Sequence, residues 1–147
     1  MRDNQWLEEQ LQFLLKTYFA NVAINNPIQI KFGREAKYRF GSIKLLRKKG
    51  LSVFRKDSAP QKSIITITSM FAREHVPENV VRYTISHELC HYAHGFSSMN
   101  KQMFRHPHHG GIVNRELTQR GAESLIRDFK AWLKGYRRAI MAARVKI

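Results

Sequence analysis

Apolar positions at the start of the chain recur at helical spacing. Between about Asn4 and Val22, leucine, tyrosine and valine residues follow one another at intervals of three or four positions. This spacing is typical of an amphipathic helix that packs along one face. Asp3 stands directly before the stretch and is a preferred N-cap residue. The pattern predicts an N-terminal helix from about Asn4 to Val22.

Beyond Pro27 the apolar residues alternate with polar ones instead. Ile28, Ile30 and Phe32 form the first such run, and Gly33 ends it. Alternation of this kind predicts a half-buried β-strand. Three further strands are expected at residues 38–45, 51–55 and 63–69. The last of these is β-branched nearly throughout, so it gives the clearest strand signal.

Two helical patterns follow the strands. Pro77 suits the first turn of a helix that should run to about His94 and stop at Gly95, a plausible C′ residue. A final helix is expected from near Asn114, with a basic tail beyond Gly135. Because the strands are grouped rather than alternating with helices, the order predicts an α+β fold and not a doubly wound sheet.

The helix expected after Pro77 carries the clearest chemical motif. Residues 87 to 91 read His-Glu-Leu-Cys-His. Two positions four apart share one face of a helix, with Cβ atoms about 5–6 Å apart, so His87 and His91 can bind one Zn²⁺. Glu88 lies about 100° around the helix, beside the metal but not required to bind it. A separate apolar stripe is left to pack against the core: Val81, Ile85, Leu89 and Tyr92.

This arrangement predicts hydrolytic chemistry. Zinc lowers the pKa of a bound water molecule toward ~7, and a neighbouring carboxylate can take the proton as the water attacks a carbonyl. Glu88 is therefore the candidate general base. By helical count Cys90 points roughly 80° off the histidine pair, on the side away from Glu88, and is expected to be an ordinary buried or half-buried thiol.

A catalytic zinc takes three protein ligands and keeps one position open. His94 cannot join the pair, because seven helical residues separate it from His87 by about 10.5 Å of rise. The third ligand must therefore come from elsewhere in the chain. The residues alone leave four candidates open in one short stretch: His106, His108, His109 and Glu116.

The chain is strongly basic. Among 147 residues, 26 Lys and Arg face 11 Asp and Glu, for a formal charge of +15. Such a surface attracts phosphate polymers or acidic surfaces within about a Debye length, ~8 Å at physiological salt. Non-specific DNA or RNA is thus a candidate partner, with clusters at Arg47-Lys48-Lys49 and Arg137-Arg138. The alternative is a surface that only keeps the protein soluble.

No apolar run approaches the ~20 residues that span a bilayer, and the N-terminus has no apolar signal core. Cys90 is the single cysteine, so an intrachain disulfide cannot form. These features predict no membrane contact and a cytoplasmic location.

With these motifs, residues 28 to 133 resemble the SprT family of zinc peptidases, which includes the DNA–protein crosslink protease Spartan. The resemblance rests on the strand pattern, on the motif at residues 87–91, and on a later His-Gly pair before a closing helix. It implies that His87 and His91 are ligands and that Glu88 is the general base. The third ligand implied is the histidine directly before glycine, His109, with His108 as its neighbour. A compact gluzincin would instead use Glu116.

The resemblance also implies a zincin-like α+β fold in one domain, residues 1–135, followed by a basic tail at 136–147. It implies that the strand from Ile64 to Ser69 borders the cleft, where an extended peptide could pair with its edge. The expected function is a zinc metallopeptidase that cleaves peptide bonds, with DNA-associated proteins as one class of substrate. Two alternatives remain: a non-proteolytic, zinc-bearing nucleic-acid-binding module, and a zinc hydrolase of a non-peptide bond.

Overall fold

The computed structural model describes residues 1–47, 61–104, 108 and 111–145. Within these ranges the elements are four α-helices, three strands and a short 3-10 helix: α1 (Asn4–Tyr18), β1 (Ile28–Phe32), β2 (Gly41–Leu46), β3 (Lys62–Ile67), η2 (Ser69–Ala72), α2 (Glu78–Ala93), α3 (Ile112–Gln119) and α4 (Glu123–Val145). The expected α+β class is confirmed.

The strands form one small mixed sheet in the order β1-β3-β2. The central strand, β3, pairs in parallel with β1 and antiparallel with β2. The part of the chain that the structure describes has three strands where about four were expected. The remaining expected strand, residues 51–55, lies outside the described residues.

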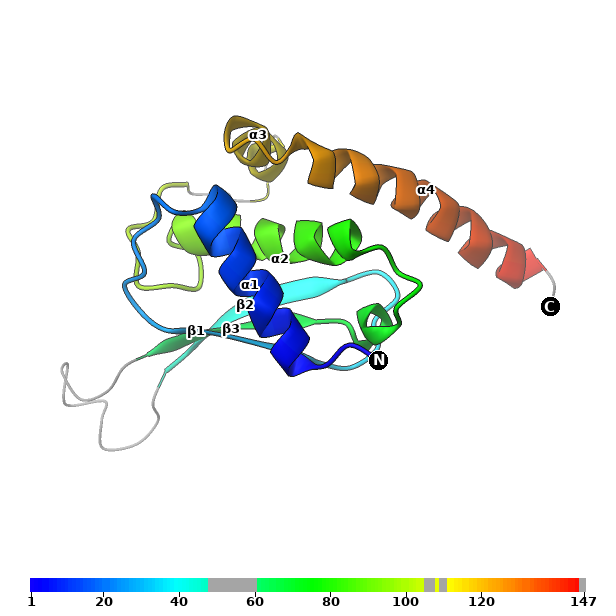
Figure 1. Cartoon of the computed structure of the whole chain (residues 1–147), viewed down its shortest axis with the longest axis horizontal. Helices are drawn as coiled ribbons and strands as arrows, with labels where there is room; N and C mark the ends of the chain where they lie inside the picture. The colour runs from blue at the N-terminus through cyan, green and yellow to red at the C-terminus, as the bar shows by residue number, and fades with distance from the viewer. Residues whose placement is uncertain (48–60, 105–107, 109–110, 146–147) are drawn as a thin grey trace.

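Helices α1 and α2 pack on the sheet and enclose the core (Figure 1). In β3, alternate residues are buried, and Ile65 and Ile67 are fully inaccessible. The apolar faces of α1 and α2 meet them there, through residues such as Leu11 and Ile85. The core stripe expected in α2 is confirmed, because its four members are at most 1% exposed: Val81, Ile85, Leu89 and Tyr92.

Helix α1 begins where expected but ends earlier. The Asp3 side chain accepts a hydrogen bond from the backbone N–H of Trp6 at 2.8 Å, which caps the helix. The last helical residue is Tyr18, not Val22. Arg120 explains the early end, because its guanidinium donates to the Tyr18 carbonyl and stacks 4.6 Å above the Phe19 ring. The chain can therefore leave the helix there with that carbonyl satisfied.

Helix α2 stops where the sequence indicates. Gly95 adopts a left-handed conformation with φ 80°. Its N–H donates to the Tyr92 carbonyl and the next N–H, of Phe96, donates to the His91 carbonyl. This is the Schellman arrangement, and its left-handed residue explains the glycine.

The single final helix expected from Asn114 is instead two helices. Gly121 has φ 82° and ends α3 with the same pair of Schellman hydrogen bonds, so the chain turns before α4 begins. Helix α4 then continues through residues 136–145, the described part of the expected basic tail. No helix in the described ranges is long and apolar enough to cross a membrane.

Candidate metal centre

The two histidines of the motif meet on one face of α2. The Nε2 atoms of His87 and His91 lie 3.2 Å apart. Two nitrogens that bind one tetrahedral zinc at 2.0–2.1 Å would be separated by about 3.4 Å. The spacing of this pair therefore fits a shared zinc ion without any rearrangement of the helix.

A third histidine approaches the pair from the segment between α2 and α3. The candidate ligand atoms of His87, His91 and His108 all lie within 4.8 Å of one another. The ring centroid of His108 is 4.5 Å from that of His91, and its side chain is exposed. His108 would therefore need to move inward by about 1–2 Å to reach ligand spacing.

His106 and His109, with Gly110, lie outside the described residues. Of the four candidates that the sequence left open, His108 is thus the only described histidine, and it does join the pair.

Burial keeps the paired imidazoles neutral. It lowers the pKa of His87 to about 4 and that of His91 to about 3, and the neighbouring imidazoles contribute in the same direction. A neutral imidazole has a free lone pair, which is the form that binds a metal. At neutral pH both residues are therefore ready to act as ligands.

Glu88 lies beside the pair, and its side chain is largely buried. Its side chain is 6% exposed, and no described group donates a hydrogen bond to its carboxylate. Burial raises its pKa to about 7, while the charge of Arg39 acts in the opposite direction. A carboxyl group with this pKa can take up and release a proton near neutral pH, as a general base must.

A cavity of about 260 Å³ opens beside Glu88 and His87. Aromatic side chains make up much of its wall: Tyr38, Phe40, Tyr83 and Phe129. The expected second strand would have included residues 38–40, but β2 begins only at Gly41. Residues 38–40 line this cavity instead, and nothing in their sequence pattern distinguishes that role.

Gly41 brings the start of β2 into close contact with α2. A Cβ atom at this position would lie 2.7 Å from the Thr84 methyl group and 3.5 Å from a carboxylate oxygen of Glu88. The lack of a side chain thus permits the strand to pass directly beside the candidate base. This function of Gly41 was not predicted, because a glycine inside a strand pattern signals only a bulge or a close approach of unknown partner.

One part of the cleft prediction is wrong: the strand from Ile64 to Ser69 does not offer an edge to which an extended peptide could add. β3 is hydrogen-bonded on both sides and has no edge for a peptide to join. The strand next to Glu88 is β2, and its outer edge has no strand partner in the described part of the chain. The sequence of β3 favoured it because it is the strongest strand former, yet such apolar, β-branched strands commonly lie in the sheet centre.

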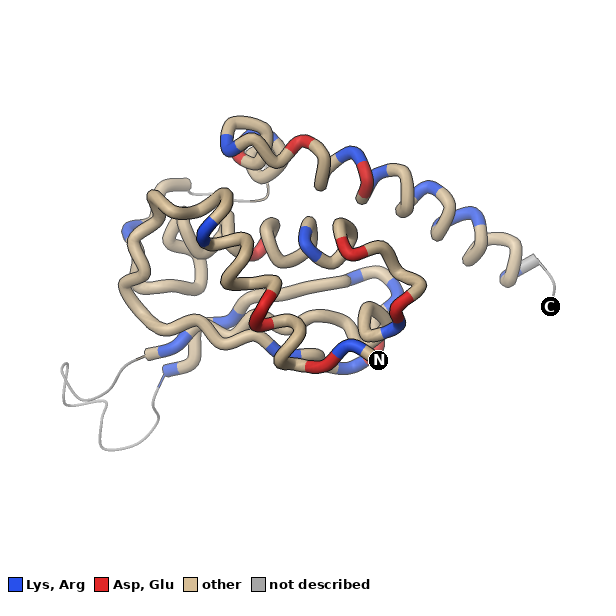
Figure 2. The backbone as a smooth tube through the Cα atoms, viewed as in Figure 1, with Lys and Arg blue, Asp and Glu red and all other residues tan. Residues whose placement is uncertain are grey.

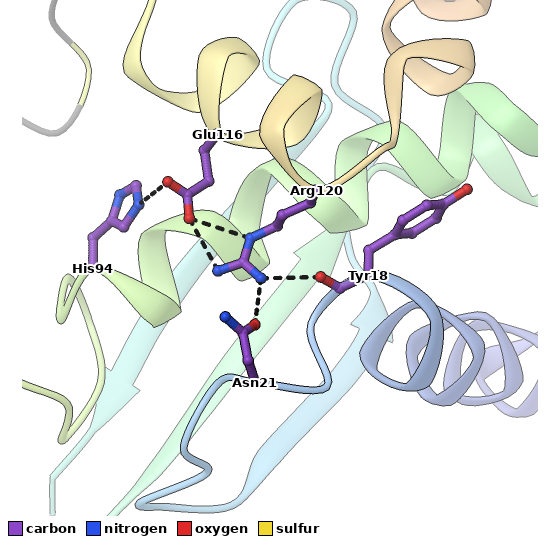
Figure 3. A network of polar contacts seen from close by, with 5 residues as sticks. All are labelled: Tyr18, Asn21, His94, Glu116 and Arg120. Carbon is purple, nitrogen blue, oxygen red and sulfur yellow. Dashed lines mark hydrogen bonds and ion pairs between the residues drawn. The ribbon is translucent and has the colours of Figure 1, made fainter.

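The alternative ligand Glu116 belongs to a different group of residues (Figure 3). Its Oε1 accepts hydrogen bonds from Nε and a terminal nitrogen of Arg120 at 3.2 and 2.9 Å. Its Oε2 lies 3.4 Å from Nε2 of His94, a residue that is 1% exposed. Arg120 also donates to the Tyr18 carbonyl and to Asn21. We call these five residues the Arg120 network.

One remaining expectation concerns Cys90, which lies within the motif at residues 87–91. Cys90 is fully buried, as expected, and burial raises the pKa of its thiol to about 12. It is therefore a protonated thiol that packs in the core.

Comparisons with known proteins do not identify a relative. No protein-family model, curated protein or solved structure matches the chain.

Proposed function

We propose that this chain is a zinc-dependent metallopeptidase with a zincin-like α+β domain of the SprT type. One observation carries the proposal. Two neutral imidazoles, His91 buried and His87 half-buried, lie at zinc-sharing distance on a helix, and Glu88 between them in the motif contributes a carboxylate whose pKa is near 7. Structural zinc sites have no need of such a carboxylate, whereas hydrolysis requires a base.

His87 and His91 would hold the zinc, together with a third histidine. Among the described residues that histidine is His108, while the family resemblance favours His109. Three nitrogen ligands with one open position are the donor set of a catalytic zinc. When bound, zinc supplies a Lewis acid that polarises a substrate carbonyl and acidifies a water molecule.

The chain's own residues then account for the remaining roles. Glu88 takes the proton from the attacking water and returns it to the departing amine. The outer edge of β2 passes beside that carboxylate and offers backbone N–H and C=O groups to an extended peptide. The aromatic cavity next to His87 can receive one side chain of such a peptide.

A nucleic-acid-binding function has separate support. Beyond Asp128, helix α4 carries basic residues and no acidic one (Figure 2). Phosphate contact along this face would suit a peptidase that acts on DNA-associated proteins, or a zinc-bearing binding module without catalysis. The position of Glu88 favours the enzyme. A hydrolase of a non-peptide bond would need the same zinc and base, but not the strand edge beside them. The cytoplasm is the proposed location, since the single cysteine suits a reducing compartment.

The test combines metal content with one substitution. Protein loaded with zinc and freed of excess should hold one zinc per chain by elemental analysis and should cleave an unfolded protein such as reduced casein. Glu88→Gln keeps the shape but not the base, so we expect it to retain zinc and to lose activity by about 10²–10⁴-fold. Glu8→Gln, on the exposed face of α1, is the matched control. Equal cleavage by the Glu88 variant would remove the assigned role.

A further inference from the structure

The cavity beside Glu88 is part of a longer depression. A second hollow adjoins it along β2 and shares Arg39, Phe40 and Gly41 with it. A third hollow, along α4, shares Tyr38, Phe40 and Phe129 with the cavity. A bound chain that extended away from Glu88 in either direction would therefore enter one of these two hollows.

The charge along this depression is one-sided. Six basic side chains line the three hollows: Arg34, Lys37, Arg39, Lys44, Arg137 and Arg144. Among the described residues, Glu88 is the single acidic one that lines any of them. Several described acids are instead engaged elsewhere, as in the pairs of Glu35 with Arg73 and of Glu116 with Arg120. No described carboxylate lies within 4.0 Å of a basic nitrogen of Arg34, Arg39 or Lys44.

The outer edge of β2, which has no strand partner among the described residues, determines which kind of molecule fits. Its backbone groups repeat at the spacing of a polypeptide strand, which a peptide can match by antiparallel or parallel pairing. Alternate side chains of an added strand would point to opposite faces of the sheet. One set would face α2, Glu88 and the aromatic cavity. The other set would face the side of Lys44, which is exposed opposite the buried Ile43.

We propose that the substrate is an acidic polypeptide segment, bound in extended form along the outer edge of β2, with its carboxylates facing Arg34, Arg39 and Lys44. The inference rests on the proposed peptidase function and specifies its substrate class. Every second residue of the segment is acidic, and an apolar residue between them enters the cavity beside Glu88. A basic depression concentrates such a chain and repels a basic one.

Two labelled peptides of about ten residues test this. Both alternate a polar residue with apolar ones around a central Phe, and the polar residue is Glu in one and Gln in the other. Binding is measured by fluorescence anisotropy with zinc-loaded Glu88→Gln protein, so that no cleavage intervenes. We expect the Glu peptide to bind at least about fivefold more tightly at low salt, as two exposed ion pairs would give. The preference should shrink as salt rises.

The double variant Arg34→Gln/Lys44→Gln should abolish most of this preference and leave the Gln peptide unaffected. The matched control is Lys130→Gln/Lys134→Gln, which removes the same charge from α4 at positions that line none of the three hollows. Equal binding of the two peptides, or equal loss of preference in the control variant, would overturn the proposal. Binding of a labelled oligonucleotide that requires Arg34 and Lys44, while the two peptides bind equally well, would also overturn it. The depression would then be a nucleic-acid-binding surface.

The wild-type protein separates this inference from the function on which it rests. If the Glu peptide binds with the expected preference but no peptide is cleaved after zinc loading, the peptidase assignment fails and the proposed docking of acidic segments in the basic depression stands. If cleavage occurs with equal kcat/KM for both peptides, the peptidase assignment stands and the substrate class proposed here is wrong.

Discussion

Two groups of residues combine histidine with glutamate, one on helix α2 and one where α1, α2 and α3 meet, and they differ in what surrounds the carboxylate. In the Arg120 network, Glu116 is neutralised by a guanidinium that makes two hydrogen bonds to it. In the candidate metal centre, Glu88 has no described hydrogen-bond donor, although it is the more buried of the two. A paired carboxylate is typical of a structural contact, whereas an unpaired buried one marks a place where chemistry is expected.

The histidines differ in the same way. His91 faces another imidazole at a distance that a metal would bridge. His94, one turn further along, faces Glu116 and lies against the ring of Phe104. The comparison therefore predicts that the first group controls metal binding and that the second one holds α1, α2 and α3 together.

Zinc affinity should show the largest contrast. His91→Gln removes one ligand nitrogen, so we expect the affinity for zinc to fall by at least about 100-fold. Glu116→Ala should leave the affinity near that of the native protein. A competition titration with a chelator of known affinity measures both, with circular dichroism as the check on folding. If the Glu116 variant lost zinc as readily as the His91 variant, Glu116 would be a zinc ligand. The predicted difference between the two groups would then be wrong.

The second-largest effect is expected in the pH dependence of the free energy of unfolding. In the zinc-free protein the pKa of Glu88 is raised from 4.5 to about 7. The folded state therefore holds this proton more tightly than the unfolded state does. The stabilisation is complete below pH 4.5 and is lost as pH rises to about 7, up to about 3 kcal/mol in total.

Urea unfolding of wild-type and Glu88→Gln protein at several pH values isolates this contribution, because the other titrating groups cancel in the difference. The wild type should lose stability relative to the variant between pH 4.5 and 7. A constant difference across this range would show that burial does not raise the pKa of the Glu88 carboxyl group.

The smallest effect is expected for substitutions in the Arg120 network, where the free energy of unfolding should change only modestly. Glu116→Gln leaves Arg120 with a weaker, uncharged partner, which should lower the free energy of unfolding by about 1–2 kcal/mol. The same chemical change at Glu88 should not destabilise the zinc-free protein at pH 7, since it removes a buried charge without a partner. Urea unfolding at that pH compares the two variants directly. A larger loss for Glu88→Gln than for Glu116→Gln would reverse the roles assigned to the groups.

Local patterns were sufficient for the parts of this molecule that depend on neighbouring residues. The cap at Asp3, the end of α2 at Gly95 and the spacing of His87 and His91 all follow from short stretches of sequence. The order of the strands in the sheet does not follow from such short stretches, because strand pairing depends on contacts between segments that are distant in the sequence. The strength of the β3 pattern indicated a strand and gave no information about whether it lies at an edge.

The sequence also could not predict which residues would contact the buried polar groups. Glu116 was a reasonable ligand candidate by residue type and position. Its engagement with Arg120 is an i,i+4 pair that the sequence could have suggested, but the contact with His94 depends on how α3 packs against α2. The same holds for Arg39 and the aromatic residues of the cavity, which come from three separate segments.

Gly41 has a consequence for how this protein can change by mutation. Every substitution there adds at least one carbon atom, at 2.7 Å from a methyl group that the Thr84 hydroxyl holds in place through its hydrogen bond to the Val80 carbonyl. The resulting strain would separate β2 from α2, and in doing so would move the strand away from Glu88. At most positions stability and activity can drift independently, but at Gly41 they are coupled. Selection for either property alone would therefore preserve the glycine.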